Sequence, residues 1–128
     1  MSNKRQFKNR TWNSVLTNTG VTLSVNSDKI SVIIGTRHSA CKASFKKGAI
    51  ADLAKMLKDC DKFGAYSSRA GVWLRVQQLE SGYLFTLTTP NDSRNVILYP
   101  EQAQKVAEVL GRMCGGVQEA KPQPITNA

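Results

Sequence analysis

The chain of 128 residues is 41% hydrophobic and 21% charged, a composition that fits one globular domain with an apolar core rather than a disordered chain. None of its apolar runs approaches the roughly 20 residues that cross a bilayer, which excludes a membrane-spanning helix. Eighteen basic residues against nine acidic ones give a net charge of +9. This charge predicts a polyanionic partner, nucleic acid rather than a membrane surface, because no amphipathic anchor helix accompanies it.

The first part of the chain carries most of this charge. Residues 1–50 contain nine basic residues and one acidic residue, whereas residues 51–128 contain nine basic and eight acidic residues. Residues 1–11 lack apolar periodicity and are predicted to form a flexible basic arm, and no apolar segment follows it, which argues against a secretory signal. The candidate nucleic-acid contacts in and beside the arm are Lys4, Arg5, Lys8, Arg10 and Trp12. For Trp12 two roles stay open, stacking on a base or pinning the arm to the sheet.

The next segments predict strands followed by a helix. Apolar residues alternate over residues 21–25, 30–34 and 43–45, with the period of two that is typical of strands packed on one face. From Lys47 the spacing becomes helical, and the predicted apolar stripe is Ile50, Leu53, Ala54 and Leu57. Residues 15–17 are the candidate for an additional short strand ahead of this unit.

The second part of the chain repeats the same pattern. The sequence AGVWLRV at 70–76 echoes TGVTLSV at 19–25 with an offset of 51 residues. Later positions match at 53, because the loop QLESG is two residues longer and loops accommodate such insertions at little cost. A helix is predicted to begin at Pro100 and to end at Gly115 and Gly116. Ahead of the second unit, residues 66–68 correspond to the short strand candidate of the first.

The predicted fold class is α+β. It consists of two tandem β-β-β(-β)-α repeats, about residues 12–62 and 66–114, with one or two antiparallel sheets and the helices packed on one face. Residues 12–114 are therefore expected to form a single domain. Residues 115–128, which are polar and rich in Gly and Pro, are expected to form a disordered tail.

A sheet covered by helices on one face leaves its other face open, and the alternation assigns side chains to that face. Trp73 and Arg75 alternate with Val72 and Leu74, so an aromatic ring and a cation are predicted to lie side by side on the open face. The other candidate nucleic-acid contacts are Arg37, Lys42, Lys46, Lys47 and Tyr99. Three apolar residues predicted on the same face, Ile33, Leu84 and Ile97, indicate that part of it is covered, and a homodimer or homotetramer is expected.

Two tandem units of antiparallel strands closed by a helix, with a basic sheet face, resemble the whirly-type single-stranded DNA-binding proteins. The resemblance is architectural, covers about residues 12–113, and includes no diagnostic motif of that family. It implies a twisted sheet that binds single strands through base stacking and backbone contacts, with helices that pack the subunits together. The size, the basic arm and the polar tail are also similar to small bacteriophage proteins that coat single strands or regulate transcription from them.

Catalytic and metal-binding patterns are missing from the sequence. No GxxxxGK[ST] loop, GxSxG elbow or HExxH pair occurs, so an enzyme is not expected and no catalytic residue is assigned. His38 and three scattered cysteines match no zinc-site spacing, so no metal or other cofactor is expected. The odd number of cysteines without a CxxC pair favours a reducing compartment, the cytoplasm or, for a viral protein, the host cytoplasm.

The leading hypothesis is a non-enzymatic nucleic-acid-binding protein that prefers single-stranded DNA, with RNA left open, and that acts in phage replication or transcription regulation. Two alternatives stay beside it. One is a small interaction protein that regulates or inhibits an acidic protein partner, such as RNA polymerase or a replication protein, through a patch of Ile33, Leu84 and Ile97. The other is a structural protein that packages nucleic acid.

Overall fold

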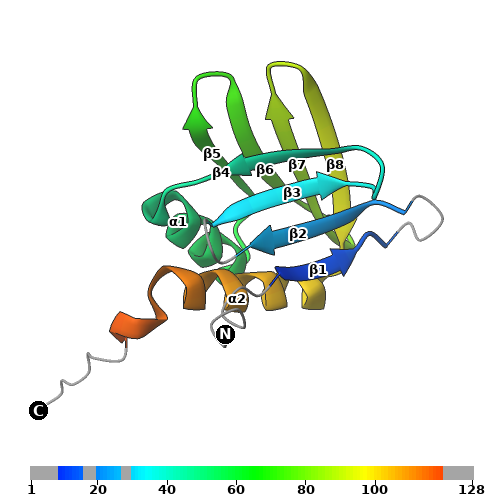
Figure 1. Cartoon of the computed structure of the whole chain (residues 1–128). Helices are drawn as coiled ribbons and strands as arrows, with labels where there is room; N and C mark the ends of the chain where they lie inside the picture. The colour runs from blue at the N-terminus through cyan, green and yellow to red at the C-terminus, as the bar shows by residue number, and fades with distance from the viewer. Residues whose placement is uncertain (1–8, 16–19, 27–29, 120–128) are drawn as a thin grey trace, which may run out of the picture.

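The computed structural model describes residues 9–15, 20–26 and 30–119. In these residues eight strands form two four-stranded antiparallel sheets, and one helix follows each sheet in the chain (Figure 1), which confirms the α+β class. Sheet A contains β1 (Asn9–Asn13), β2 (Thr22–Asn26), β3 (Ser31–Gly35) and β4 (Ala40–Ser44), and α1 (Lys47–Lys58) follows it. Sheet B contains β5 (Phe63–Arg69), β6 (Val72–Leu79), β7 (Gly82–Thr89) and β8 (Asp92–Leu98), and α2 (Pro100–Glu119) follows it.

The central strands of the two sheets pair in the same way. Leu23 of β2 lies opposite Ile34 of β3, and Leu74 of β6 lies opposite Leu87 of β7. The strand order within each sheet is sequential, so strands that follow one another in the chain are neighbours in the sheet. Each sheet is therefore a meander that can bury one face and expose the other.

The element boundaries differ from the sequence prediction at both ends of the described chain. An additional strand lies at Asn9–Asn13, so it begins inside the segment expected to be a flexible arm. Of the strand candidate at 15–17, Val15 is not in a strand, and residues 16–17 lie outside the described residues. Trp12 anchors β1 opposite Leu23, while the backbone N–H of Val15 donates to the carbonyl of Ile97 in sheet B at 2.9 Å. At the other end α2 continues to Glu119 through the two glycines expected to stop it, because a helical glycine costs only about 1 kcal/mol relative to alanine.

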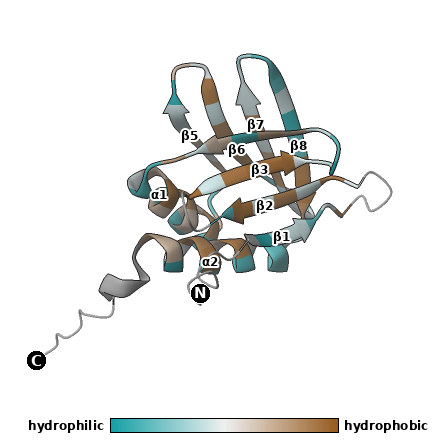
Figure 2. Cartoon of the chain, in the orientation of Figure 1, coloured by the Kyte–Doolittle hydropathy of each residue, from teal (hydrophilic) through white to brown (hydrophobic). Residues whose placement is uncertain are grey.

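The apolar faces of both sheets and both helices form one continuous core. Strands β3 and β4 pack against β7 and β8, and α1 packs against α2. The largest fully buried side chains of this core include Leu23, Ile34, Ile50, Leu57, Leu74, Phe85, Leu98 and Leu110. Figure 1 shows sheet A in front of sheet B, whose hairpins β5–β6 and β7–β8 project beyond β4, with the helices below and beside the sheets. In Figure 2 the hydrophobic colour concentrates on β2 and β3, whereas the projecting ends of β5 and β8 are hydrophilic.

Hydrogen bonds fix the start of α2 relative to the rest of the fold. The backbone N–H of Tyr99 donates to Gln102 Oε1 at 2.8 Å, which caps the first turn of the helix. Gln102 Nε2 in turn donates to the carbonyl of Asn13 at 3.1 Å, so the helix start is tied to the end of β1. Gln104 Nε2 donates to the carbonyl of Leu57 at 2.7 Å and joins the two helices.

In the described part of the chain no helix combines the length and the apolar character needed to cross a bilayer.

Two glycines offer a matched test of the packing around sheet A. A methyl group on Gly35 would collide with the backbone of Ser39 and Ala40, whereas one on Gly48 in α1 would meet no atom within 4 Å. Gly35→Ala is expected to lower the free energy of unfolding by about 1–3 kcal/mol, because backbone atoms cannot move aside cheaply. Gly48→Ala is expected to raise it by about 0.4–1 kcal/mol through reduced entropy of the unfolded chain. Urea denaturation followed by circular dichroism measures both, and equal effects of the same sign would contradict this packing.

Candidate nucleic-acid interface

The face of sheet B that points away from the core carries three rows of side chains across its four strands, and we call this surface the open face. The strand register gives the rows as Ser67, Trp73, Thr88 and Ser93; Ala65, Arg75, Thr86 and Asn95; and Phe63, Gln77, Leu84 and Ile97. None of these residues is acidic. The open face therefore combines hydroxyl, amide, aromatic and cationic groups without a carboxylate that would repel a polyanion.

Trp73 and Arg75 are the sharpest feature of the open face, and both point outward as the alternation predicts. The exposed fraction of Trp73 is 36%, and the Arg75 guanidinium carbon lies 5.5 Å from the centroid of the indole ring. At this distance the cation and the ring attract each other, which holds the arginine beside the aromatic surface. Around them Thr86 Oγ1 donates to Asn95 Oδ1 at 2.8 Å, so neighbouring polar side chains also support one another.

Phe63 is a second aromatic residue on the open face that the sequence analysis missed. Its side chain is 58% exposed and shares a row with Gln77. The sequence indicated a strand only over residues 66–68, because Gly64 and Ala65 blur the alternation that Phe63 begins. Tyr99, which follows β8 directly, is 51% exposed. Among the described residues, these two and Trp73 are the exposed large hydrophobic side chains, and all three belong to β5–β8 or the residue after them.

The predicted basic residues of the first unit lie on a different surface. Lys42 is exposed on the outer face of sheet A opposite Ile33, and Arg37 lies in the turn between β3 and β4. Lys46 precedes α1 and Lys47 begins it. Because the two sheets pack through their inner faces, the outer face of sheet A points away from the open face of sheet B. The single surface expected from the sequence is therefore wrong, because the basic residues of the first unit lie on a different side of the molecule from Trp73 and Arg75.

The structure also bears on the predicted apolar patch and on the role of Trp12, which the sequence left open. Leu84 and Ile97 are neighbours on the open face, but Ile33 lies on sheet A, so the three residues form no continuous apolar patch. Trp12 packs against the core, which fits the pinning role rather than base stacking, and Arg10 beside it is exposed. Lys4, Arg5 and Lys8 lie outside the described residues.

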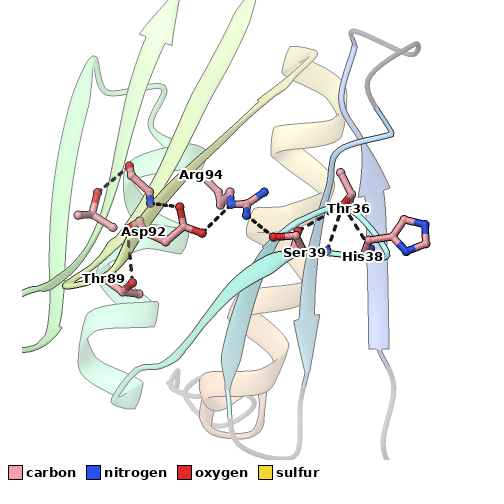
Figure 3. Close-up of polar contacts among 8 residues, drawn as sticks. Thr36, His38, Ser39, Thr89, Asp92 and Arg94 are labelled. Carbon is pink, nitrogen blue, oxygen red and sulfur yellow. Dashed lines mark hydrogen bonds and ion pairs between the residues drawn. The ribbon is translucent and has the colours of Figure 1, made fainter.

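A polar network joins the two sheets near the β7–β8 turn (Figure 3). Arg94 Nε donates to Asp92 Oδ2 at 2.9 Å, and another guanidinium nitrogen of Arg94 donates to Ser39 Oγ in the β3–β4 turn. The Arg94 hydrogen bond, followed by the bond from the Ser93 backbone N–H, holds the pKa of Asp92 below its usual range. Burial and the nearby Asp92 carboxylate raise the pKa of the Cys41 thiol. The network thus fixes the β3–β4 turn against sheet B.

Neither a metal-binding cluster in the described residues nor a similar known protein indicates a function. Within residues 9–15, 20–26 and 30–119, no cluster of three or more His, Cys, Asp or Glu side chains could hold a metal ion. No protein-family model matches the chain, and comparisons with curated proteins and with solved structures give no match. The geometry of the open face is therefore what bears on function.

The Asp92–Arg94 pair predicts a pH dependence of stability. The pKa of Asp92 is depressed in the folded state, so the Asp92 carboxylate stabilises the fold above its ordinary pKa near 4. This stabilisation is lost as the pH falls through the folded-state pKa. Asp92→Asn is expected to lower the melting temperature at pH 7, and the difference from wild type should shrink below about pH 4. Thermal scans at pH 3 to 7 measure the difference. A gap between the two proteins that stays constant over this range would contradict the depressed pKa.

Proposed function

We propose that the protein binds single-stranded nucleic acid, with a preference for DNA, on the open face of sheet B, and that it does so without catalysis. The observation that carries this proposal is the exposure of Phe63 and Trp73 on a face without acidic residues, with the Arg75 guanidinium beside Trp73. Unstacked bases gain about 1–3 kcal/mol each by stacking on such rings. Bases in a duplex already stack on one another, so this surface favours single strands.

The spacing of the two rings fits separate bases of one strand. Phe63 pairs with Gln77, which lies four residues from Trp73 along β6. With about 3.3 Å per residue and 4.8 Å between strands, the two positions are roughly 14 Å apart. Two aromatic platforms at this separation would hold two bases that are not adjacent, while Arg75 between them neutralises an intervening phosphate.

The availability of the cations supports the same proposal. The ion pairs of the described residues use Lys55, Arg94, Lys105 and Arg112. Arg37, Lys42 and Arg75 make none of these pairs, so their charges are not neutralised by carboxylates of the described chain. The matching strand register of the two sheets also supports a tandem duplication. In this proposal the second unit keeps the aromatic residues and the first keeps most of the charge.

Removal of the aromatic rings tests the proposal. Trp73→Ala is expected to weaken binding of fluorescein-labelled oligo-dT by about 1–3 kcal/mol, or roughly 5- to 150-fold in Kd, as measured by fluorescence anisotropy. Phe63→Ala should weaken it independently, because the two rings are too far apart to couple. Trp73→Phe is the matched control, which keeps a flat ring and should retain most of the affinity. Wild-type affinity in both alanine variants would contradict base stacking on this face.

One observation favours a second candidate function, docking of another copy of the chain. The row at one end of the open face contains three apolar residues, Phe63, Leu84 and Ile97, with Gln77 between the first two, and it lies beside strand edges that can take part in pairing. If this row is a subunit interface, Leu84→Thr combined with Ile97→Thr should shift the protein toward monomer in sedimentation equilibrium. A wild type that stays monomeric throughout the micromolar range would contradict this candidate.

A further inference from the structure

The edge strands β4 and β5 line an open surface hollow next to both candidate surfaces. It is lined by Lys42, Ala43, Ser44, Ser68 and Arg69 and has a volume of about 410 Å³. This volume is within the range of sites that hold small ligands. Ser68 Oγ donates to the carbonyl of Ser44, and this hydrogen bond joins the two strands beside the hollow. The hollow is thus a defined feature at the junction of the two sheets.

A β-bulge in β5 directs Arg69 toward the hollow. Ser67 pairs with Trp73 on the open face, but the register then shifts, and Arg69 pairs with Val72, whose side chain faces the core. Residues two apart in a regular strand share a face, so the bulge places Ser67 and Arg69 on opposite faces of sheet B. The hydroxyl of Ser67 stabilises this arrangement, because its Oγ donates to the carbonyl of Arg69 at 3.2 Å and to the carbonyl of Val72 at 3.3 Å.

The hollow is cationic and uncompensated. Both Lys42 and Arg69 are exposed, and none of the residues that line the hollow is acidic. Neither side chain takes part in an ion pair or a side-chain hydrogen bond to another described residue. Two unpaired cations beside serine hydroxyls form the chemistry that binds a phosphodiester, through charge and through hydrogen bonds to the phosphate oxygens.

The hollow also connects the two surfaces that the fold separates. Lys42 belongs to the outer face of sheet A, and Arg69 belongs to the edge strand of sheet B. Trp73 lies only one strand in from that edge, because its neighbour across the ladder is Ser67 of β5. A chain in the hollow therefore has to cross a single edge strand, about 5 Å, to reach the indole ring.

We propose that the hollow holds the phosphate backbone of a bound single strand between Lys42 and Arg69, and that the strand runs from sheet A through the hollow and over β5 onto Trp73. This path rests on the proposed function and adds a phosphate site to it. It explains how cations on one side of the molecule and aromatic residues on the other serve one ligand. Arg69, which had no assigned role, becomes a binding residue.

The salt dependence of binding tests the path. For single strands the slope of log K against log salt changes by about 0.7 for each phosphate contact, so Lys42→Gln combined with Arg69→Gln should reduce the slope for dT20 by about 1.4. Between 50 and 200 mM salt, wild type should then lose about sevenfold more affinity than this variant. Lys105→Gln combined with Arg112→Gln on α2 is the control, since it removes the same charge from a helix surface. It should keep the wild-type slope.

The outcomes separate the path from the proposed function. If wild type binds dT20, Trp73→Ala weakens binding, and the Lys42 and Arg69 variant keeps the wild-type slope, the path through the hollow is wrong while the open face still binds. An equal reduction of slope in the α2 control would also overturn the path, because the effect would then reflect net charge alone. If wild type does not bind dT20, the proposed function fails and the path fails with it.

Discussion

The packing of β3 and β4 against β7 and β8 is the constraint on which the rest of the structure depends. Each sheet contributes its apolar face to one shared core, which also takes in the inward faces of both helices. Hydrophobic burial of this kind is the main source of stability in a chain of this size. Its geometric consequence is that the remaining sheet faces point apart, and each is free to carry polar, charged and aromatic side chains.

Because the outer face of sheet B points away from the core, its side chains are not constrained to be apolar. The open face needs no large apolar residue for the core, so it can expose Phe63 and Trp73 at the cost of leaving them in water. Aromatic exposure of this extent beside an arginine suits a ligand that brings its own flat rings and negative charge. The hollow between β4 and β5 then supplies cations where the bound nucleic-acid strand would leave the aromatic rings. The Arg94 network holds the β3–β4 turn in place, and this turn directly precedes β4.

Local alternation predicted the sides of individual strands well. The buried positions Val72, Leu74 and Val76 placed Trp73 and Arg75 outward, and the structure has them there. The strand at Asn9–Asn13 was not predicted, because its pairing depends on Trp12 meeting Leu23, while Val15 bonds to sheet B far along the chain. Such long-range contacts leave no periodic signal in a short segment.

The relation between the two surfaces could not be predicted from alternation either. A period of two tells which residues of one sheet share a face, but it does not tell how two sheets are oriented around a common core. Ile33 and Leu84 therefore looked equivalent in the sequence and lie on opposite sides in the structure. The bulge that turns Arg69 away from Ser67 is likewise invisible to a pattern that assumes regular strands.

The central claim is that unstacked bases lie on Trp73. In Trp12→Phe, Trp73 is the only remaining tryptophan, so its fluorescence reports on the open face alone. Titration with oligo-dT at moderate salt should quench this fluorescence with saturation, and duplex DNA of equal length should quench it far less at the same concentration. Equal quenching by duplex and single strand, or no quenching by oligo-dT under conditions where it binds, would contradict the account.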